Sequence, residues 1–287
     1  MKSRLALGAL AWTLSAIACM AAPALWQVRD ADSSVWLFGS VHLLSPETNW
    51  RSTTLDKAID KADRVYFETD LSAEAQVRIT ALTFEVGFNK DGQLLSDVIG
   101  PELTDRVREA AESYGIPMAA LLTMRPWMAA MTLSSGPMLD SGYEAALGVE
   151  AVISAQVPGG RQAYLETPEQ QLDFLAGGSL EEQIGMLEAT LDTLGAMQTD
   201  LDALVNAWAA GQPEELGALF TEQMGDFDQG MVDRLIDLRN ANWVDQIDAM
   251  LERNENALIV VGAAHLTGTS SVVRLLETRG YISNRVQ

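Results

Sequence analysis

Cysteine and histidine are scarce in this chain of 287 residues, which contains one Cys and two His. A single Cys excludes both an intramolecular disulfide and a metal cluster held by several thiolates. Any metal site would therefore depend on imidazole nitrogens and carboxylate oxygens. With only two His in the chain, their positions are informative about where a site lies.

Positive charge is also scarce, because 19 Lys and Arg stand against 40 Asp and Glu, for a net charge of −21. There is no basic surface to neutralise phosphates, which argues against nucleic acid as a partner. The same acidity disfavours anionic lipid surfaces. Hydrophobic residues make up 48% of the chain and charged residues 21%, a balance that excludes disordered and collagen-like chains.

The N-terminus predicts a secretory signal peptide over residues 1–24. A basic start is followed by an uncharged, apolar run over residues 5–19 and then by small residues up to Ala24. The run is shorter than the roughly 20 residues that a membrane span needs. We expect cleavage after Ala24 or Ala21 and an exported domain over residues 25–287, in the periplasm or secreted.

A second processing route is open at Cys19. The residues before it loosely resemble a bacterial lipoprotein box, although Ala16 stands where Leu is usual. A lipid anchor on Cys19 is the one membrane attachment that the sequence suggests.

Short apolar segments, rich in β-branched and aromatic residues, predict four strands. They cover residues 35–38, 64–67 and 257–261, with a weaker candidate at 162–165. Most of the remaining chain has helical patterns, expected over 55–62, 72–87, 101–114, 117–131 with an interruption at Pro126, 179–197, 201–211, 214–224, 229–253 and 270–278. Capping boxes begin helices after Thr167 and Ser179. Strands near both ends and helices between them predict an α/β core with a large helical insertion.

Both histidines follow a predicted strand in the pattern Gly-x-x-His-Leu. His42 comes three residues after Gly39, and His265 comes three residues after Gly262. Ligands collect at the carboxyl ends of strands in α/β sheets, and glycine there permits a sharp turn or a close approach. The pair therefore indicates a site, while two hydrogen-bonded histidines packed near strand ends are the alternative.

Two glutamates repeat a second pattern, Tyr-x-Glu-Thr, at strand ends. Glu68 follows the strand next to His42 in sequence, and Glu166 follows the weaker strand. Two imidazoles and one carboxylate are a common ligand set for divalent metals, so we expect His42, Glu68 and His265 to bind one ion. The alternative for each Glu is an ordinary acidic residue at a helix N-terminus. For Glu166, this alternative and a role in the site are equally supported.

Arg239 and Asn240 lie together within the long predicted helix before the last strand. Asn is unfavourable inside a helix, which suggests that its side chain has a role. Arg239 could clamp a carboxylate or stabilise an oxyanion. We expect this pair to serve the site and not the fold, so that Arg239→Ala changes the melting temperature little. An exposed polar turn of an acidic helix is the alternative.

These residues resemble the TraB/GumN family, which groups with the Tiki proteins and more distantly with ChaN-like and erythromycin-esterase-like proteins. The resemblance covers residues 25–281. It is carried by Leu25-Trp26, Gly39-Ser-Val-His42-Leu43, Phe67-Glu68, Leu147-Gly148-Val149-Glu150, Leu165-Glu166-Thr167 with Gln170-Gln171, Arg239-Asn240, and Val261-Gly-Ala-Ala-His265-Leu266-Thr-Gly268. Many relatives have Thr at position 40 and Asp at position 150.

The resemblance implies a mixed sheet in two pseudo-related halves and a site made of His42, Glu68 and His265, with Arg239 and Asn240 nearby. Tiki proteins are metal-dependent proteases that use manganese or cobalt, and GumN-like proteins are linked to polysaccharide biosynthesis. We therefore expect a secreted metal-dependent hydrolase, a peptidase first, acting on a peptide or small molecule. Manganese or cobalt is the expected cofactor, with zinc or iron next, and the catalytic residues would be Glu68, Glu166, Arg239 and Asn240. A non-catalytic haem or metal carrier and an accessory protein of envelope polysaccharide remain open.

Overall fold

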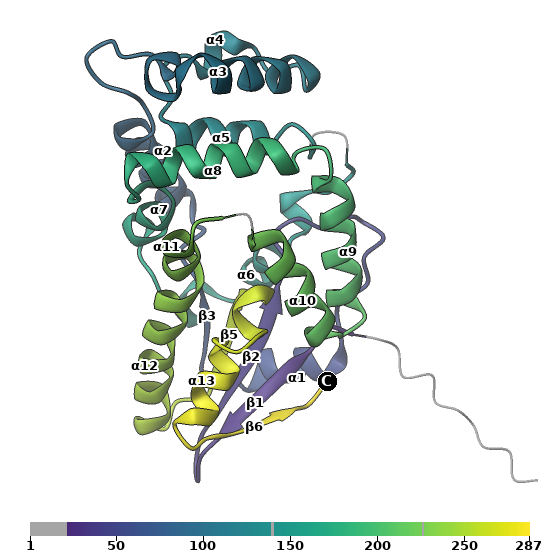
Figure 1. Ribbon diagram of the computed structural model, residues 1–287. Coiled ribbons are helices and arrows are strands. Elements are labelled where there is room, and N and C mark those ends of the chain that lie inside the picture. The colour runs from purple at the N-terminus through teal and green to yellow at the C-terminus, as the bar shows by residue number, and fades with distance from the viewer. Residues whose placement is uncertain (1–21, 139–140, 226) are drawn as a thin grey trace, which may run out of the picture.

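The computed structural model describes residues 22–138, 141–225 and 227–287 (Figure 1). Cys19 and most of the predicted signal peptide lie outside these residues. Among the helices that are described, none is both long and apolar enough to cross a membrane.

Six strands form one mixed sheet in the order β4-β3-β5-β2-β1-β6. The strands are β1 (Leu25–Arg29), β2 (Ser34–Ser40), β3 (Arg64–Phe67), β4 (Gln162–Tyr164), β5 (Ala257–Gly262) and β6 (Ile282–Arg285). Strands β4, β3, β5 and β2 are mutually parallel, whereas β1 is antiparallel to both β2 and β6. The carboxyl ends of four adjacent strands therefore meet at one edge of the sheet.

All four predicted strands are confirmed, but β1 and β6 were missed. The segment of β6, Ile-Ser-Asn-Arg, is largely exposed and has no apolar pattern. It is a strand only because it pairs with β1 at the border of the sheet. The α/β class is confirmed with this six-stranded mixed sheet.

Alternation along β2 explains why helices cover both faces of the sheet. Val35 and Leu37 face one core, which includes side chains of α12 and α13. Trp36 and Phe38 face the other core, shared with α1, α6, α9 and α10. Successive strand residues point to opposite faces, so two apolar sets in one strand require helices on both sides.

A separate helical block lies beyond the carboxyl end of β2 in Figure 1, with α3, α5 and α8 at its centre. The helices are α1 (Thr53–Lys61), α2 (Ala73–Val86), α3 (Leu95–Ser113), α4 (Met118–Leu121), α5 (Pro126–Ser134), α6 (Val149–Gln156), α7 (Pro168–Ala176), α8 (Leu180–Thr193), α9 (Met197–Ala209), α10 (Pro213–Met224), α11 (Gln229–Val232), α12 (Leu238–Glu252) and α13 (Val272–Thr278). Shorter turns are η1 (Ala145–Leu147), η2 (Gly159–Arg161), the π-helical η3 (Asp233–Asp237) and η4 (Ala263–Leu266).

The predicted helix boundaries are mostly confirmed. Both capping boxes exist, at Thr167 for α7 and at Ser179 for α8. The predicted helix over 117–131 is two helices, α4 and α5, because Pro126 begins a new helix. Helix α3 starts earlier than predicted and is kinked at Gly100, whose φ is 78°.

Candidate functional site

The four predicted strand-end residues lie along one edge of the sheet. Glu166 follows β4, Glu68 follows β3, His265 follows β5 within η4, and His42 follows β2. These strands are neighbours in that order, so segments far apart in sequence place two carboxylates and two imidazoles at the same edge. The prediction that both Gly-x-x-His motifs lie at strand ends is confirmed.

Arg239 of α12 connects three of these four residues. Its Nε and Nη2 donate to the two carboxylate oxygens of Glu166, both at 2.9 Å, and Nη2 also donates to Oε2 of Glu68 at 2.6 Å. Nη1 lies 3.2 Å from Nε2 of His265 and 3.2 Å from the carbonyl of Leu235. A guanidinium has five N–H groups, and these five contacts account for all of them.

The surroundings of Arg239 contradict its interpretation as an exposed polar turn. Arg239 is 8% exposed and Asn240 is fully buried. The guanidinium carbon lies 4.8 Å from the ring centre of Trp243 and 5.0 Å from that of Phe174. Because Arg239 is buried and ion-paired, we now expect Arg239→Ala to lower the melting temperature clearly, in place of the small change that the sequence predicts. With every N–H in use, Arg239 positions site residues and has no donor left to clamp a substrate.

His265 is held as a neutral imidazole with a defined tautomer. Nδ2 of Asn240 donates to the carbonyl of Ser270 at 2.9 Å, so its Oδ1 faces the ring and lies 2.7 Å from Nδ1 of His265. This oxygen only accepts, so Nδ1 carries the proton and Nε2 keeps its lone pair. Burial lowers the pKa of His265 to about 3, which keeps the ring uncharged.

Glu68 stays ionised although its side chain is only 11% exposed. Burial raises its pKa, but the electrostatic influence of His265, Arg239 and His42 outweighs this and lowers the pKa to about 2. His265, whose own pKa is about 3, is itself protonated at the pH where Glu68 titrates, so both His265 and Arg239 favour the ionised carboxylate there, while Arg239 alone of these two carries the charge at neutral pH. The backbone N–H of Gly262 donates to Oε1 of Glu68 at 2.6 Å. A Cβ at position 262 would lie 3.2 Å from that oxygen, so glycine permits the approach.

His42 differs from His265 because its ring is 70% exposed. Its Nδ1 lies 2.9 Å from Oε1 of Glu150, a buried carboxylate that also accepts a hydrogen bond from the hydroxyl of Ser40. The charge of Glu150 is the main cause that raises the pKa of His42 to about 9. Solvent around the ring weakens this ion pair relative to a buried one. Among the described residues, Nε2 of His42 has no hydrogen-bond partner, so this nitrogen can meet a ligand.

Glu150 was missed as a site residue, although it stands in one of the motifs that carried the family resemblance. It lies in the first turn of helix α6 and far in sequence from His42, so neither spacing nor periodicity linked the two residues. Gln171 was missed although it follows Glu166 closely, because it lies inside helix α7 and not at a strand end. Its Nε2 donates to Glu166 at 2.6 Å and lies 3.3 Å from Oε2 of Glu68.

His42, Glu68, Glu150 and Gln171 line one cavity of about 600 Å³. A second cavity of about 750 Å³ begins at the residue after His42. It is lined mainly by apolar side chains, from α5, α9 and α10 (Met131, Met197, Leu204 and Met224) and from the segments between helices and strands (Leu43, Met138 and Phe227). The strand-end edge therefore borders one polar cavity and one apolar cavity.

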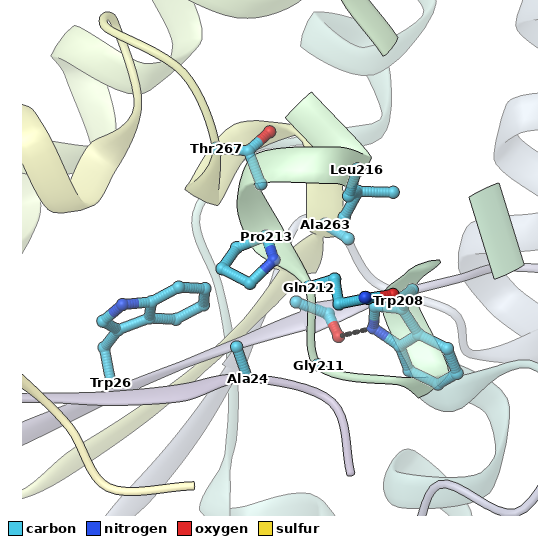
Figure 2. A pocket seen from close by; sticks show the side chains of 10 residues that line it. Ala24, Trp26, Trp208, Gly211, Gln212, Pro213, Leu216, Ala263 and Thr267 are labelled. Atoms are coloured by element: carbon cyan, nitrogen blue, oxygen red, sulfur yellow. Dashed lines mark hydrogen bonds between the residues drawn. The ribbon is translucent and has the colours of Figure 1, made fainter. Parts of the chain in front are cut away.

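The two Gly-x-x-His segments are in contact with each other. A Cβ at Gly39 would lie 3.0 Å from Cα of Ala263, which belongs to the second motif. The carbonyl of Gly39 accepts a hydrogen bond of 2.8 Å from the indole of Trp208 (Figure 2). The small cavity drawn in that figure contains none of the four strand-end residues. Glycine is needed at position 39 for this close approach.

The donors expected to bind a metal do not form a ligand group in this arrangement. Within residues 22–138, 141–225 and 227–287, no three His, Cys, Asp or Glu side chains are placed to hold one ion. Nε2 of His265 and Oε2 of Glu68 both face Arg239, and Nδ1 of His42 faces Glu150. The residues present therefore do not fit the predicted metal ion as they stand.

Comparison with known proteins decides the family. The model of the TraB/PrgY/gumN family matches residues 24–285, nearly the whole described chain. The chain belongs to the TraB/PrgY/gumN family. This membership confirms the resemblance inferred from the two Gly-x-x-His motifs and the residues between them.

Among curated proteins, this TraB/PrgY/gumN chain is similar to an uncharacterized protein of Treponema pallidum (strain Nichols). The two are 23% identical over 274 residues, covering 88% of this chain and 80% of the relative. It is also similar to the uncharacterized protein YbaP of Escherichia coli (strain K12), at 23% identity over 242 residues, 84% of this chain and 86% of YbaP. YbaP of Shigella flexneri has the same values. No solved structure matches this chain.

Gly148 controls the position of His42, which gives a direct test of the site. A Cβ at position 148 would lie 2.1 Å from the carbonyl oxygen of His42. Gly148→Ala must therefore displace the backbone of His42 or the start of α6, where Glu150 lies. We expect a loss of roughly 1–3 kcal/mol in the free energy of unfolding, typical of overpacking, and a lower pKa for His42.

Chemical denaturation and NMR titration of the His42 ring would measure the two effects. Gly185→Ala is the matched control, because a Cβ there meets nothing within 4 Å and the position is inside α8. That control should be neutral or stabilise the protein by up to about 1 kcal/mol. Equal stability and an unchanged His42 pKa in Gly148→Ala would show that the close contact does not position His42.

Proposed function

We propose that this protein is an exported hydrolase whose reaction takes place in the cavity shared by His42, Glu68 and Glu150. The observation that supports it is the exposed ring of His42, held through Nδ1 by a buried carboxylate. A histidine oriented in this way by an acid is the usual arrangement of a proton-transfer group in hydrolases. The proposed core is Tiki-like, with two pseudo-related halves that each contribute a Gly-x-x-His motif.

His42 transfers the proton in this proposal. Its neutral form takes a proton from the attacking water through Nε2, and its charged form returns a proton to the leaving group. Glu150 and Ser40 hold the ring in place and stabilise the charged form. Because the pKa of His42 is raised to about 9, the base is mostly protonated at neutral pH. The rate should therefore increase with pH up to about 9.

The sequence predicts a divalent metal ion, manganese or cobalt first and zinc or iron next, but the contacts that Arg239 makes with Glu68 and His265 argue against such an ion in the resting protein. When bound, such an ion would polarise the substrate and activate water. The hydrolytic steps above do not depend on it, because the present contacts of Glu68 and His265 leave no common position for an ion.

The proposed substrate is a peptide with apolar side chains or a small molecule of similar character. The apolar cavity begins at Leu43, the neighbour of His42, and Tyr143 lines it while Ala145 lines the polar cavity. The two cavities therefore share the chain segments at their border. A volume of about 750 Å³ falls within the range of small-molecule sites. Methionine-rich walls adapt to different apolar groups.

The same apolar cavity supports a second candidate, a non-catalytic carrier of a haem-like or other apolar ligand. Tyr143 lines the cavity, but its hydroxyl donates to Asp202 at 2.6 Å and its pKa is raised to about 12, mainly by burial. This tyrosine is therefore poorly prepared to act as an axial ligand. The hydrolase remains our proposal. Export, with or without a lipid anchor on Cys19, is part of it.

An assay with internally quenched peptides tests the hydrolase directly. Wild type should cleave peptides with apolar side chains, and His42→Gln should lower kcat/KM by about 10²–10⁴-fold, the usual contribution of a proton-transfer group. The same peptides should be tested after chelation and after addition of manganese or cobalt. Haem titration, followed by absorbance, tests the carrier. No cleavage by wild type under any of these conditions, together with stoichiometric haem binding, would replace the hydrolase with the carrier.

A further inference from the structure

We propose that the guanidinium of Arg239 is the resident cation of this site and occupies the position where the sequence pattern predicts a metal ion. Most of the donors expected around a metal are present, but they are directed at this side chain. The proposal does not depend on the hydrolase function, because it concerns what the strand-end residues bind in the resting protein.

The contacts of Arg239 are those of an ion with its ligands. Two carboxylates and one imidazole surround it, with Glu68 at 2.6 Å, Glu166 at 2.9 Å and His265 at 3.2 Å. His265 presents a lone pair, because Asn240 fixes the proton on the other ring nitrogen. In metal sites, a hydrogen bond from the ring nitrogen that does not bind the metal usually orients the histidine in the same way. Here the oriented lone pair faces a guanidinium.

Charge supports the same conclusion. The side chains of Glu68 and Glu166 are only 11% and 4% exposed, and the two carboxylates would repel each other without a cation between them. Arg239 meets Glu166 with two donors and Glu68 with one, and aromatic rings of Phe174 and Trp243 lie near its guanidinium. Such a pocket favours a planar, delocalised cation over a small, strongly hydrated one.

Removing the guanidinium should therefore create a metal site. In Arg239→Ala, the oxygens of Glu68 and Glu166 and Nε2 of His265 would surround an open space with a negative charge. Mixed carboxylate and imidazole donors suit zinc, manganese or cobalt. Wild type should lack this site, because Arg239 competes with the metal for all three ligands.

The experiment is calorimetric titration of the full exported chain with manganese, cobalt and zinc chlorides, together with melting temperatures in the presence and absence of each salt. We expect no saturable binding by wild type at millimolar metal and no change in its melting temperature. Arg239→Ala should bind one ion in the micromolar range, and its melting temperature should rise with metal. Adding Glu68→Gln or His265→Ala to Arg239→Ala should abolish both the metal binding and the metal-dependent rise in melting temperature.

Rescue by ethylguanidinium chloride is a second test. This salt supplies the guanidinium that Arg239→Ala lacks, and a purely structural role of Arg239 would not predict that the salt stabilises the variant. At millimolar concentration it should raise the melting temperature of Arg239→Ala but not that of wild type. Arg239→Gln serves as the alternative variant if Arg239→Ala does not fold. Stoichiometric metal binding by wild type that is lost in Glu68→Gln and His265→Ala would overturn the proposal. It would also be overturned if neither folded Arg239 variant gains metal binding, or if neither variant folds with or without added metal.

Discussion

Arg239→Ala is expected to lower the free energy of unfolding by about 3–5 kcal/mol at neutral pH, the usual cost of removing one partner from a buried ion pair. The variant leaves two carboxylates with little solvent exposure, Glu68 and Glu166, without their cation, and it leaves an unfilled space beside Trp243. Urea denaturation in metal-free buffer, followed by tryptophan fluorescence, measures the change.

Arg274→Ala is the matched control for this effect. Arg274 is 67% exposed and pairs with Glu277 on the surface of α13, so its removal should cost less than about 1 kcal/mol. An Arg239→Ala variant as stable as the Arg274→Ala control would contradict the central role of Arg239 in holding the site together.

The pH dependence of the Arg239 effect has a defined sign. The pKa of Glu68 falls from an ordinary value of 4.5 to about 2 in the folded protein. A carboxylate with a lowered folded-state pKa contributes stability above its unfolded pKa, and this is lost as the pH falls through the folded value. The difference between wild type and Arg239→Ala should therefore decrease between about pH 4.5 and pH 2. A difference that stays constant across this range would contradict the contribution of Glu68.

The two histidines are expected to titrate about six pH units apart, because Glu150 raises the pKa of His42 to about 9 and burial lowers that of His265 to about 3. Since the chain has only two His, a long-range ¹H–¹⁵N spectrum resolves both rings. The spectrum should also show His265 as the tautomer protonated on Nδ1, because Asn240 accepts that proton. These measurements use metal-free protein.

Glu150→Gln tests the cause of the high pKa of His42. Without the carboxylate, the pKa should fall from about 9 toward the ordinary value of 6.5. A raised folded-state pKa contributes stability below the unfolded pKa, and that contribution is lost as pH rises through the folded value. Wild type should therefore lose this small stabilisation between about pH 6.5 and pH 9, and Glu150→Gln should not.

Glu144→Gln removes an exposed carboxylate six residues away and should leave the His42 titration unchanged. If His42 titrates near 6.5 in wild type, or if Glu150→Gln leaves it near 9, the ion pair does not determine the protonation state of His42.

The core strands could be predicted because their apolar residues carry a local pattern. Residues 35–38 and 257–261 are buried on both faces, so each reads as a continuous apolar run ended by glycine. The border strand β6 could not be predicted, since Ile282–Arg285 becomes a strand only through its pairing with β1. Backbone pairing between distant segments leaves no periodic trace in such a polar sequence.

The sequence by itself determined which residues would stand at the carboxyl edge of the sheet. Each of His42, Glu68, Glu166 and His265 directly follows a recognisable strand, and parallel neighbouring strands end at the same edge. The apolar pattern of each short segment is enough to place these residues, because the end of a strand is marked by the residues next to it in the sequence. Family membership was evident from the same motifs.

Only the tertiary structure decided how these groups are paired. Arg239 and Glu150 belong to helices that are remote in sequence from the strands they serve, and helix packing alone brings them to Glu166 and His42. The outcome is a buried cation among the predicted ligands and an exposed imidazole held by an unpredicted carboxylate. Pairing of charges depends on distances between packed elements, and the spacing of residues along the chain does not contain those distances.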